Sequence, residues 1–173
     1  MTELDYTVLA LIARDGPLSA YDVRKDFAAS LTPTWSSSTG SIYPSIRRLV
    51  EGGFARASAP QGARGKQKLT ITPAGRATLS EWLCTATSAT AAPTPDPIRT
   101  RAHFLRLLSK GARAKFLTDA RKNTEAALAE AEARTAQRKA SGATKEEYLP
   151  GVGVEYELKA RRDWLALLAR ELT

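Results

Sequence analysis

The apolar residues of the amino-terminal half change their spacing twice along the chain, and this change restricts the fold more than any other feature. Apolar side chains that recur every three or four residues predict a helix with one buried face, whereas strict alternation predicts a half-buried strand. The helical spacing occurs three times before residue 53, alternation follows over residues 54–58 and 66–71, and helical spacing returns after residue 72. The predicted order is therefore helix, helix, helix, hairpin, helix, which is the plan of a winged helix-turn-helix domain.

Two short helices are expected first, at residues 4–13 and from residue 20 to residue 31. The sequence DGP at residues 15–17 breaks the first helix, Ser19 can cap the second, and Pro33 is expected to end it. The buried stripe of the first helix consists of Leu4, Val8, Leu11 and Ile12, and that of the second consists of Ala20, Val23, Phe27 and Leu31.

The stretch SSSTGSIYPSIRRLVEGG, residues 36–53, predicts a third helix with one apolar and one polar face. Its apolar face consists of Ile42, Ile46, Leu49 and Val50, and two glycines, Gly52 and Gly53, end the helix. The opposite face of the opening turns consists of Ser41, Tyr43, Ser45, Arg47 and Arg48. A recognition helix contacts DNA with its first residues, and small hydroxyl residues there allow close approach and donate to phosphate. We therefore expect this polar face to contact nucleic acid.

Several details of the third helix stay open in the sequence. Its cap is either Ser38 or Ser41. One of the two arginines can pair with Glu51, three or four residues on, instead of meeting DNA. Tyr43 can contact DNA or support the hairpin, and we favour DNA, whereas for Tyr21 at the start of the second helix the two roles are evenly balanced.

The hairpin is expected from FARAS, residues 54–58, and KQKLTI, residues 66–71, joined by a loop rich in glycine and arginine. Three basic residues, Arg64, Lys66 and Lys68, lie at its tip and on its outward alternation, where they can reach phosphates or a narrow minor groove. The alternative is a merely solvated face, but charge, hairpin and helix occur together and favour binding. Thr72 is the expected cap of the next helix, which continues to residue 83.

The charge balance fits a nucleic-acid partner. The 173 residues include 26 Lys and Arg against 18 Asp and Glu, a formal net charge of +8 at pH 7. A basic balance alone also fits RNA or an anionic membrane. Most of the excess lies in residues 47–76, where Glu51 is the single acidic residue beside Arg47, Arg48, Arg56, Arg64, Lys66, Lys68 and Arg76. The clustering of charge, and not its sum, therefore supports DNA binding.

Other classes of protein are disfavoured by composition. With one cysteine and one histidine, the chain cannot form an internal disulfide, and we expect no metal site and no cofactor. The cysteine, Cys84, is expected to be a small buried residue beside Trp82 and Leu83. GARGK at residues 62–66 lacks the frame of a phosphate-binding loop, and we expect no enzyme. No apolar run approaches the roughly 18 to 20 residues that span a bilayer, and the acidic start is unlike a signal peptide, so we expect a cytoplasmic protein with no membrane partner.

The carboxy-terminal half predicts helices that need a partner. Residues 85–97, TATSATAAPTPDP, have the composition of a linker. Helices are expected at residues 98–108, at residues 112–140 and in a last segment that ends at residue 172, within which Pro150 and Gly151 are expected to interrupt the helix. The expected dimer surface on the last helix consists of Val154, Leu158, Trp164, Leu165, Leu168 and Leu172. The division is then a DNA-binding domain at 1–86, a linker at 87–96 and a helical dimerisation domain at 97–173.

Three segments resemble the PadR family of bacterial transcriptional regulators. LDYTVLALIARDGPLSAYDVRKDF resembles the opening region of the family, SSSTGSIYPSIRRLVEGGFA is similar to its recognition segment, and KQKLTITPAGRATLSEWL resembles its return strand and next helix. Together they cover Leu4 to Leu83, and Ala20 stands where the family commonly has glycine. VEYELKARRDWLALLAREL resembles the last helix of the longer members, whereas EEYLPGVG departs from the pattern.

The resemblance implies a mainly α fold, with a winged helix-turn-helix domain, a two-stranded wing and an α-helical dimerisation domain. It implies a homodimer that binds an inverted repeat in double-stranded DNA, usually as a repressor, and is often released by a small aromatic effector. The residues and the resemblance together give the DNA-facing candidates Tyr21, Ser38, Thr39, Gly40, Ser41, Tyr43, Pro44, Arg47, Arg64, Lys66 and Lys68. The alternative function is a winged-helix adaptor that binds proteins without specific DNA binding.

An effector pocket has the weakest support in the residues. The aromatic candidates for its lining are Trp35, His103, Phe104, Phe116, Tyr148, Tyr156 and Trp164. Each is more typical of an ordinary core or interface, so the residues themselves predict no effector. A small aromatic effector of unknown identity is therefore an implication of the resemblance alone.

Overall fold

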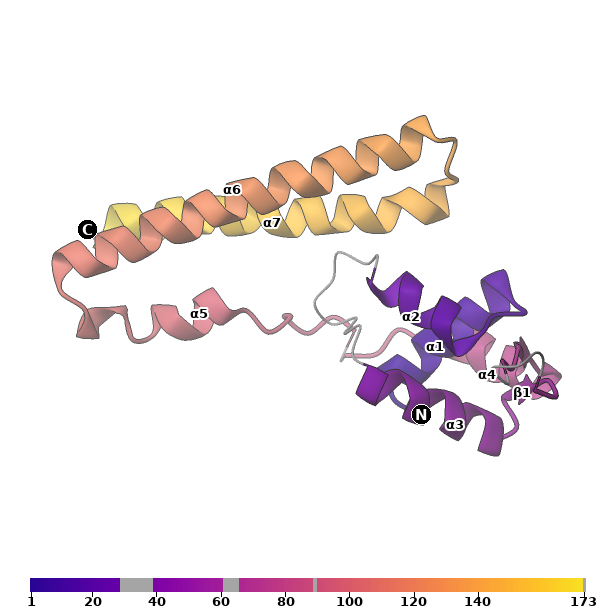
Figure 1. The fold of residues 1–173 in the computed structure, drawn as a ribbon. Coiled ribbons are helices and arrows are strands. Elements are labelled where there is room, and N and C mark those ends of the chain that lie inside the picture. Colours follow the sequence, from indigo (N-terminus) through magenta and orange to yellow (C-terminus); the bar gives the residue numbers. More distant parts are fainter. Residues whose placement is uncertain (29–38, 61–65, 89, 173) are drawn as a thin grey trace. The chain divides into compact units, whose positions relative to one another are not determined.

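The computed structural model describes residues 1–28, 39–60, 66–88 and 90–172. The chain forms two compact units, Met1–Ala92 and Pro93–Thr173, each with its own buried core (Figure 1). The boundary lies within residues 85–97, where the sequence predicts a linker. No described residue between 85 and 96 belongs to a helix or strand.

The first unit contains α1 (Glu3–Asp15), α2 (Ala20–Ala28), α3 (Thr39–Glu51), β1 (Ala55–Ala57), β2 (Leu69–Ile71) and α4 (Pro73–Cys84). This order is the helix, helix, helix, hairpin, helix plan that the apolar spacing predicts, so the winged helix-turn-helix class is confirmed. Leu31 and Pro33, expected at the end of the second helix, lie outside the described residues.

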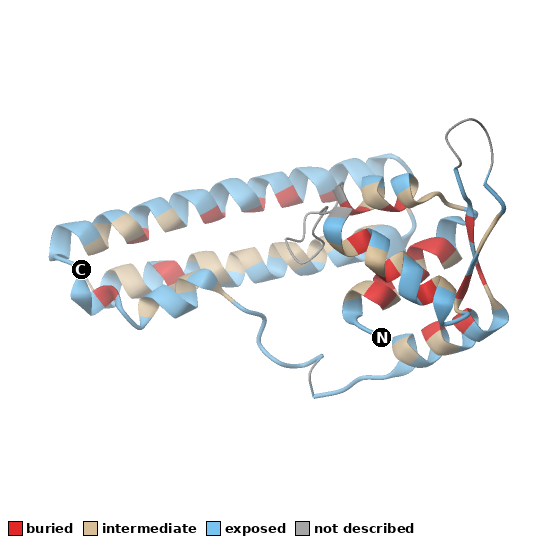
Figure 2. Cartoon of the chain, turned by 60° about the horizontal axis from the view of Figure 1, so that its bottom comes forward, coloured by how far each residue is buried: buried red, intermediate tan, exposed pale blue. Residues whose placement is uncertain are grey.

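The core of this unit is built by α1, which packs against α2, α3 and α4. Its fully buried apolar residues include Val8, Leu9, Val23 and Ile42. Figure 2 shows the buried positions of this unit, in red, on the sides of the helices that face one another. Complete burial of one such side chain contributes about 1.5–3 kcal/mol relative to exposure. This core fixes which faces of α2 and α3 point outward.

The helix ends follow the capping residues of the sequence. Thr2 and Asp5 form a reciprocal capping box on α1, and the Ser19 hydroxyl accepts from the backbone amide of Asp22 at 3.2 Å at the start of α2. Gly53, at a φ of +74°, ends α3 in the left-handed conformation that favours glycine. Of the two residues that the sequence left open as the cap of α3, Ser41 is excluded because it is the third residue of the helix, and Ser38 lies outside the described residues.

The hairpin is fastened to the helices at its base. β1 and β2 pair antiparallel with Ala55 opposite Ile71, and each strand has three residues, fewer than the alternation predicts. Leu18, between α1 and α2, exchanges two backbone hydrogen bonds with Leu69 of β2, at 3.2 and 2.7 Å. The wing therefore has a fixed attachment to the helix-turn-helix.

The second unit consists of α5 (Pro97–Ala102), a 3₁₀ turn (Leu105–Leu107), α6 (Lys110–Ala140) and α7 (Lys145–Leu172). The two long helices run antiparallel side by side (Figure 1). The helix expected at residues 98–108 is divided between α5 and the turn. Leu105, Leu117 and Leu165 form the buried centre of this unit, so the thin stripe of α6 finds its partner in α7 of the same chain.

The expected interruption at Pro150 and Gly151 is wrong, because α7 continues through both residues. Pro150 lies in the second turn, so the bond it removes is the one to the carbonyl of Glu146, an exposed residue at the helix start. Gly151 faces α6, where a Cβ atom would lie 2.8 Å from Oγ1 of Thr135. The small residue therefore allows the two helices to approach closely.

The expected burial of Cys84 is also wrong. Cys84 is the last residue of α4 and is exposed, as is its neighbour Leu83. Trp82 turns inward instead and stacks on Tyr6 of α1, with ring centroids 5.0 Å apart. The helical period of 3.6 residues places Leu79 and Trp82 on the core side and the next two residues on the outer side.

Candidate nucleic-acid interface

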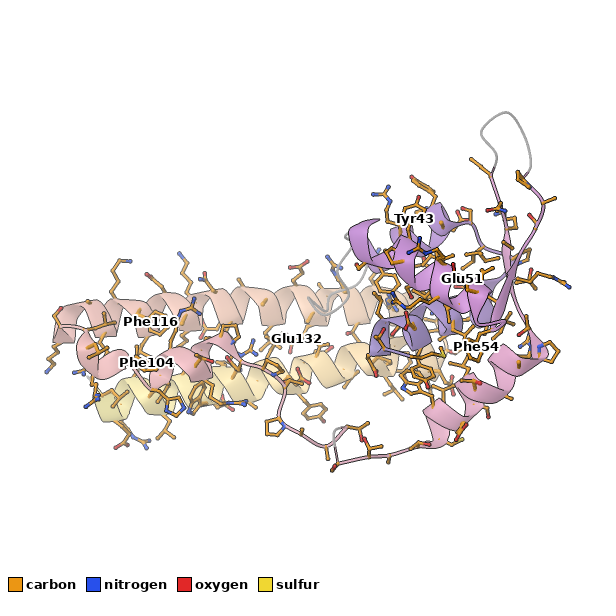
Figure 3. All side chains as sticks on the ribbon, turned by 90° about the horizontal axis from the view of Figure 1, so that it is seen from below. Tyr43, Glu51, Phe54, Phe104, Phe116 and Glu132 are labelled. Atoms are coloured by element: carbon orange, nitrogen blue, oxygen red, sulfur yellow. The ribbon has the colours of Figure 1, made fainter. Side chains whose placement is uncertain are left out.

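One face of α3 is exposed along its opening turns. Gly40, Tyr43 and Arg47, spaced at i, i+3 and i+7, all lie on this outer face, and Figure 3 shows Tyr43 projecting from the helix. Tyr43 is 54% exposed, whereas large aromatic side chains are mostly buried in folded proteins. Ile42 and Leu49 bury the opposite side, so the core itself presents this face to solvent.

Two residues that the sequence places on the same polar face point elsewhere. Ser45 is completely buried and donates a hydrogen bond from its hydroxyl to Oδ1 of Asp5 at 2.7 Å. Arg48 donates from Nη2 to the same oxygen at 2.6 Å. Ser45 therefore does not belong to the outer face of α3, and Arg48, whose side chain is half exposed, is directed toward α1 by its bond to Asp5.

The carboxylate of Asp5, which accepts hydrogen bonds from both residues, is strongly stabilised in its charged form. Burial alone would raise the pKa of Asp5, but hydrogen bonds from Arg48, from the backbone of Thr2 and from Ser45 outweigh it and hold the pKa well below its usual range. Asp5 is therefore ionised at neutral pH. The sequence contained no signal for this contact, since forty positions separate Asp5 from Ser45.

Arg47 is paired only loosely. Its Nε lies 3.9 Å from Glu51 one turn later, and both side chains are mostly exposed. An exposed pair of this kind contributes about 0.3–0.5 kcal/mol, so a phosphate can replace Glu51 at little cost. The sequence left Arg47 and Arg48 open as partners of Glu51, and the pair forms with Arg47.

The remaining candidates at the front of α3 differ in exposure. Ser41 and Pro44 are half-buried within the helix, and Thr39 is its first residue. Ser38 lies outside the described residues. The front of α3 therefore offers Gly40 and Tyr43 most openly.

The basic residues of the wing are not equivalent. Lys66 is exposed, and Lys68 places its Nζ 3.2 Å from Oδ2 of Asp22 on α2. Hydrogen bonds from the backbone and hydroxyl of Ser19, with the contact to Lys68, lower the pKa of Asp22 to about 2. Arg64 lies outside the described residues.

Tyr21, on the outer face of α2, is 59% exposed. The guanidinium carbon of Arg24 lies 5.2 Å from the centre of its ring, which is within the range of a cation–π contact. Sequence reasoning missed Arg24, although its i+3 spacing from Tyr21 on a helix could have indicated the pair. These two residues add a cation and an aromatic ring to the outer face of α2.

The dimer candidates of α7 divide into two groups. Leu165 is completely buried against Leu105 and Leu117 of its own chain, so its assignment to the dimer surface is corrected. The other candidates are half-buried within one chain: Val154, Leu158, Trp164, Leu168 and Leu172. Sequence reasoning missed Leu167, which is 43% exposed beside them.

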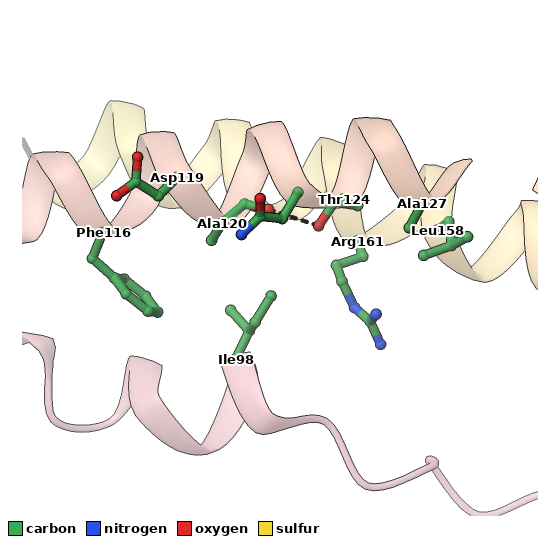
Figure 4. A pocket seen from close by; sticks show the side chains of 9 residues that line it. Ile98, Phe116, Asp119, Ala120, Thr124, Ala127, Leu158 and Arg161 are labelled. Carbon is green, nitrogen blue, oxygen red and sulfur yellow. Dashed lines mark hydrogen bonds between the residues drawn. The ribbon is translucent and has the colours of Figure 1, made fainter. Parts of the chain in front are cut away.

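A hollow of about 390 Å³ opens between α5, α6 and α7 (Figure 4). Arg161, on its wall, donates from Nε to Asp96 Oδ2 at 3.0 Å. The wall consists of Ile98, Phe116, Asp119, Ala120, Asn123, Thr124, Ala127, Leu158 and Arg161. Phe116 is the aromatic candidate that lines this hollow.

Elsewhere in the described residues, His103 packs edge-on against Phe104, Tyr148 lies under Lys139, and Tyr156 is exposed.

Comparison with known proteins relates the winged-helix unit to one family. The sequence model of the transcriptional regulator PadR-like family matches residues 8–81, a range that begins within α1, contains α2, α3 and the hairpin, and ends within α4. A crystal structure of Bacillus subtilis PadR in complex with operator DNA matches with a TM-score of 0.81 and 26% identity, over 99% of this chain and all of that chain. Over residues 8–81 the chain is therefore similar to the PadR-like family of transcriptional regulators.

Other relatives extend the PadR-like match beyond the winged helix. The negative transcriptional regulator PadR of Bacillus subtilis is 29% identical over 136 residues, which are 75% of this chain and 71% of that protein. A crystal structure of Bacillus subtilis PadR in complex with p-coumaric acid matches with a TM-score of 0.78 and 24% identity, over 98% of both chains. The helical second unit is thus part of the shared fold. No helix in the described ranges is long and apolar enough to span a membrane.

Proposed function

We propose that this PadR-like chain is a sequence-specific repressor of transcription that binds double-stranded DNA as a homodimer. The observation that carries the proposal is the exposed face of α3, where Gly40, Tyr43 and Arg47 stand outward at the front of the second helix of a helix-turn-helix. A helix in this position enters the major groove with its first residues. The related PadR that was crystallised with operator DNA supports this reading.

Each part of the chain has its own role in the proposal. The DNA-binding domain comprises residues 1–86, and the dimerisation domain comprises residues 97–173. Residues 87–96 form the linker that connects the two domains. In the DNA-binding part, α3 lies in the groove while Lys66 contacts phosphate beside it. Tyr21 and Arg24 face the flanking backbone. Positive charge of this kind positions the protein, and contacts of α3 to base edges select the sequence.

Dimerisation follows from the geometry of such readers. A two-fold dimer binds two half-sites about 34–36 Å apart, or a multiple of that distance, so the operator is an inverted repeat. The half-buried and exposed apolar residues of α7, among them Leu167 and Leu168, supply the self-complementary surface. The second unit then serves to hold two α3 helices in register.

A small aromatic effector releases the DNA in this proposal. The relative that was crystallised with p-coumaric acid supports an effector of this class. The hollow between α5, α6 and α7 is the candidate site, because it combines the ring of Phe116 with the cation of Arg161. It adjoins the linker end of the second unit, since Asp96 holds Arg161.

The alternative of a protein-binding adaptor has less support than DNA binding. An adaptor would not need the exposed cation of Lys66 beside the open face of α3. Regulators of this class act on chromosomal DNA, so the proposal includes a cytoplasmic location and no enzymatic reaction. Selection experiments separate the two functions directly.

The test is selection of duplexes from a pool of random sequence by the full-length protein. The proposal predicts enrichment of one inverted repeat after several rounds, with half-sites separated by whole turns. Enrichment of no sequence would contradict it and leave the adaptor. Light scattering of the protein bound to the enriched duplex is expected to give two chains per duplex.

A further inference from the structure

Asp5, in the first turn of α1, holds two residues of α3. Its Oδ1 accepts hydrogen bonds from Ser45 Oγ at 2.7 Å and from Arg48 Nη2 at 2.6 Å. Its Oδ2 accepts from Arg48 Nε at 3.3 Å and from the backbone amide of Thr2 at 2.8 Å. Each carboxylate oxygen thus accepts two hydrogen bonds, and the guanidinium grips the carboxylate with two nitrogens.

This cluster, Asp5 with Ser45 and Arg48, joins two side chains buried in the helix packing to a third, Arg48, whose side chain is 50% exposed. Asp5 is 1% exposed and Ser45 is not exposed at all. Apolar contacts between helices tolerate small sliding and rotation, whereas a buried carboxylate with directional partners tolerates little, because an unmade hydrogen bond there costs about 1–3 kcal/mol. The cluster therefore fixes the rotation of α3 about its own axis.

The rotation of α3 sets the direction of its outer face. Ser45 and Arg48 are one turn apart on the inner side, and Tyr43 and Arg47 are about one turn apart on the outer side. A rotation that loosens the contact to Asp5 must also swing Tyr43 and Arg47. Base recognition depends on side chains placed to within a hydrogen-bond length, whereas phosphate attraction does not.

We propose that Asp5 is a positioning residue for operator recognition, which sets the orientation of α3 through Ser45 and Arg48. The inference rests on the proposed function of DNA binding. Asp5 itself touches no DNA. Its contribution appears in the preference of the protein for its operator over other sequences, and not in its general affinity for DNA.

Electrostatics gives this proposal a distinctive signature. Removal of a negative charge raises the net positive charge and frees Arg48, so general attraction to DNA is expected to stay equal or increase. A loss of operator affinity after the same change then has to come from orientation. A merely structural role would lower the folded fraction and weaken binding to all duplexes by the same factor.

The experiment compares Asp5→Asn with wild-type protein by fluorescence anisotropy. The probes are the duplex that wild-type protein enriches from a random pool and a scrambled duplex of equal length and composition. The matched control is Asp15→Asn, which removes the same charge from the other end of α1, where Asp15 pairs with its neighbour Arg14. Circular dichroism on each protein verifies that the measurement is made well below the unfolding temperature.

The preference for the enriched duplex is expected to fall about tenfold or more in Asp5→Asn, equivalent to about 1.4 kcal/mol. Binding of the scrambled duplex is expected to be unchanged or tighter, and Asp15→Asn is expected to keep the full preference. Arg48→Lys retains the charge but cannot bond both carboxylate oxygens, so the preference for the enriched duplex is expected to fall several-fold. This variant provides the test if Asp5→Asn does not fold.

A preference within twofold of wild type in both Asp5→Asn and Arg48→Lys would overturn the positioning role. An equal loss on both duplexes would also overturn it, since that pattern reports stability. If wild-type protein enriches no duplex, the proposed function fails, and that result is distinct from either outcome for Asp5.

Discussion

Lys68 Nζ lies 3.2 Å from Oδ2 of Asp22, so the return strand of the wing is tied to the second helix by an ion pair. The same oxygen accepts hydrogen bonds from the hydroxyl and backbone of Ser19. Lys66, two residues before Lys68, is exposed. The two lysines, which alternation places on the same side of a strand, therefore have different roles: Lys68 braces the wing, and Lys66 is open to a phosphate.

Lys66→Glu is expected to weaken binding to all duplexes by a similar factor. The slope of log affinity against log salt is expected to become shallower by about 0.9 for the lost phosphate contact. The measurement is an anisotropy titration at several salt concentrations. Lys122→Glu, at an exposed position of α6, makes the same charge change in the second unit and serves as control. An unaltered slope in Lys66→Glu would remove the wing from the interface.

Arg47→Ala is expected to lower affinity for the enriched duplex by about tenfold, since a good contact from an arginine contributes about 1–3 kcal/mol. Arg121→Ala is the matched control, because Arg121 forms the same kind of pair with a glutamate four residues later but lies on α6. Both titrations use one salt concentration. Equal affinities of the two variants would contradict the role of α3.

The element order and the core of the first unit could be predicted from sequence, because apolar period and capping residues are local signals. The stripe that includes Val8 and Ile12 is buried as predicted, and so is Ile42. The partners of polar residues could not be predicted in the same way. Ser45 and Arg48 are residue types that are common on DNA-facing surfaces. Both nevertheless donate hydrogen bonds to Asp5, a residue forty or more positions away.

Acid is expected to destabilise the first unit through Asp22. The folded protein holds the pKa of Asp22 at about 2, from an ordinary value of 3.8, so the stabilisation is fully present above pH 4 and is lost as pH falls toward 2. Thermal unfolding followed at several pH values checks this. Asp22→Asn is expected to show a shallower fall of the midpoint between pH 4 and pH 2. Parallel curves for the variant and wild type would contradict the assignment.

Leu165→Ala is expected to lower the stability of the second unit by about 2–5 kcal/mol, because it removes a completely buried side chain and leaves a cavity. Leu167→Glu, on the exposed side of α7, is expected to dissociate the dimer without this loss in the unit itself. Light scattering and urea unfolding of both variants distinguish the two effects. Monomers from Leu165→Ala under conditions where its helices remain folded would restore Leu165 to the interface.

Gly75→Ala is expected to destabilise the first unit by about 1–3 kcal/mol, because the added Cβ would collide with the backbone carbonyl oxygen of Phe54. Gly111→Ala is the matched control. No atom lies within 4 Å of a Cβ at Gly111, at the start of α6, and alanine there is expected to be neutral or stabilising. Thermal unfolding compares the two. Equal midpoints would contradict the close packing of α4 on the hairpin.

Local signals also misled at Cys84 and Pro150. A cysteine that follows two apolar residues is typical of a core, but Cys84 is the last residue of α4, where the helical period turns it outward. A proline followed by glycine is typical of a helix break, but the long contact with α6 stabilises α7 through Pro150. In both places the decision depends on packing between segments, which a reading of the local sequence does not contain.

The most direct test of the account is an anisotropy titration of the full-length protein against its enriched duplex and a scrambled duplex over a range of salt concentrations. The account predicts tight binding to the enriched duplex, preserved preference at every salt concentration, and a steep loss of affinity for both duplexes as salt rises. Equal affinity for both duplexes would contradict recognition through α3, and affinity that does not respond to salt would contradict the contacts of Arg47 and Lys66 to DNA.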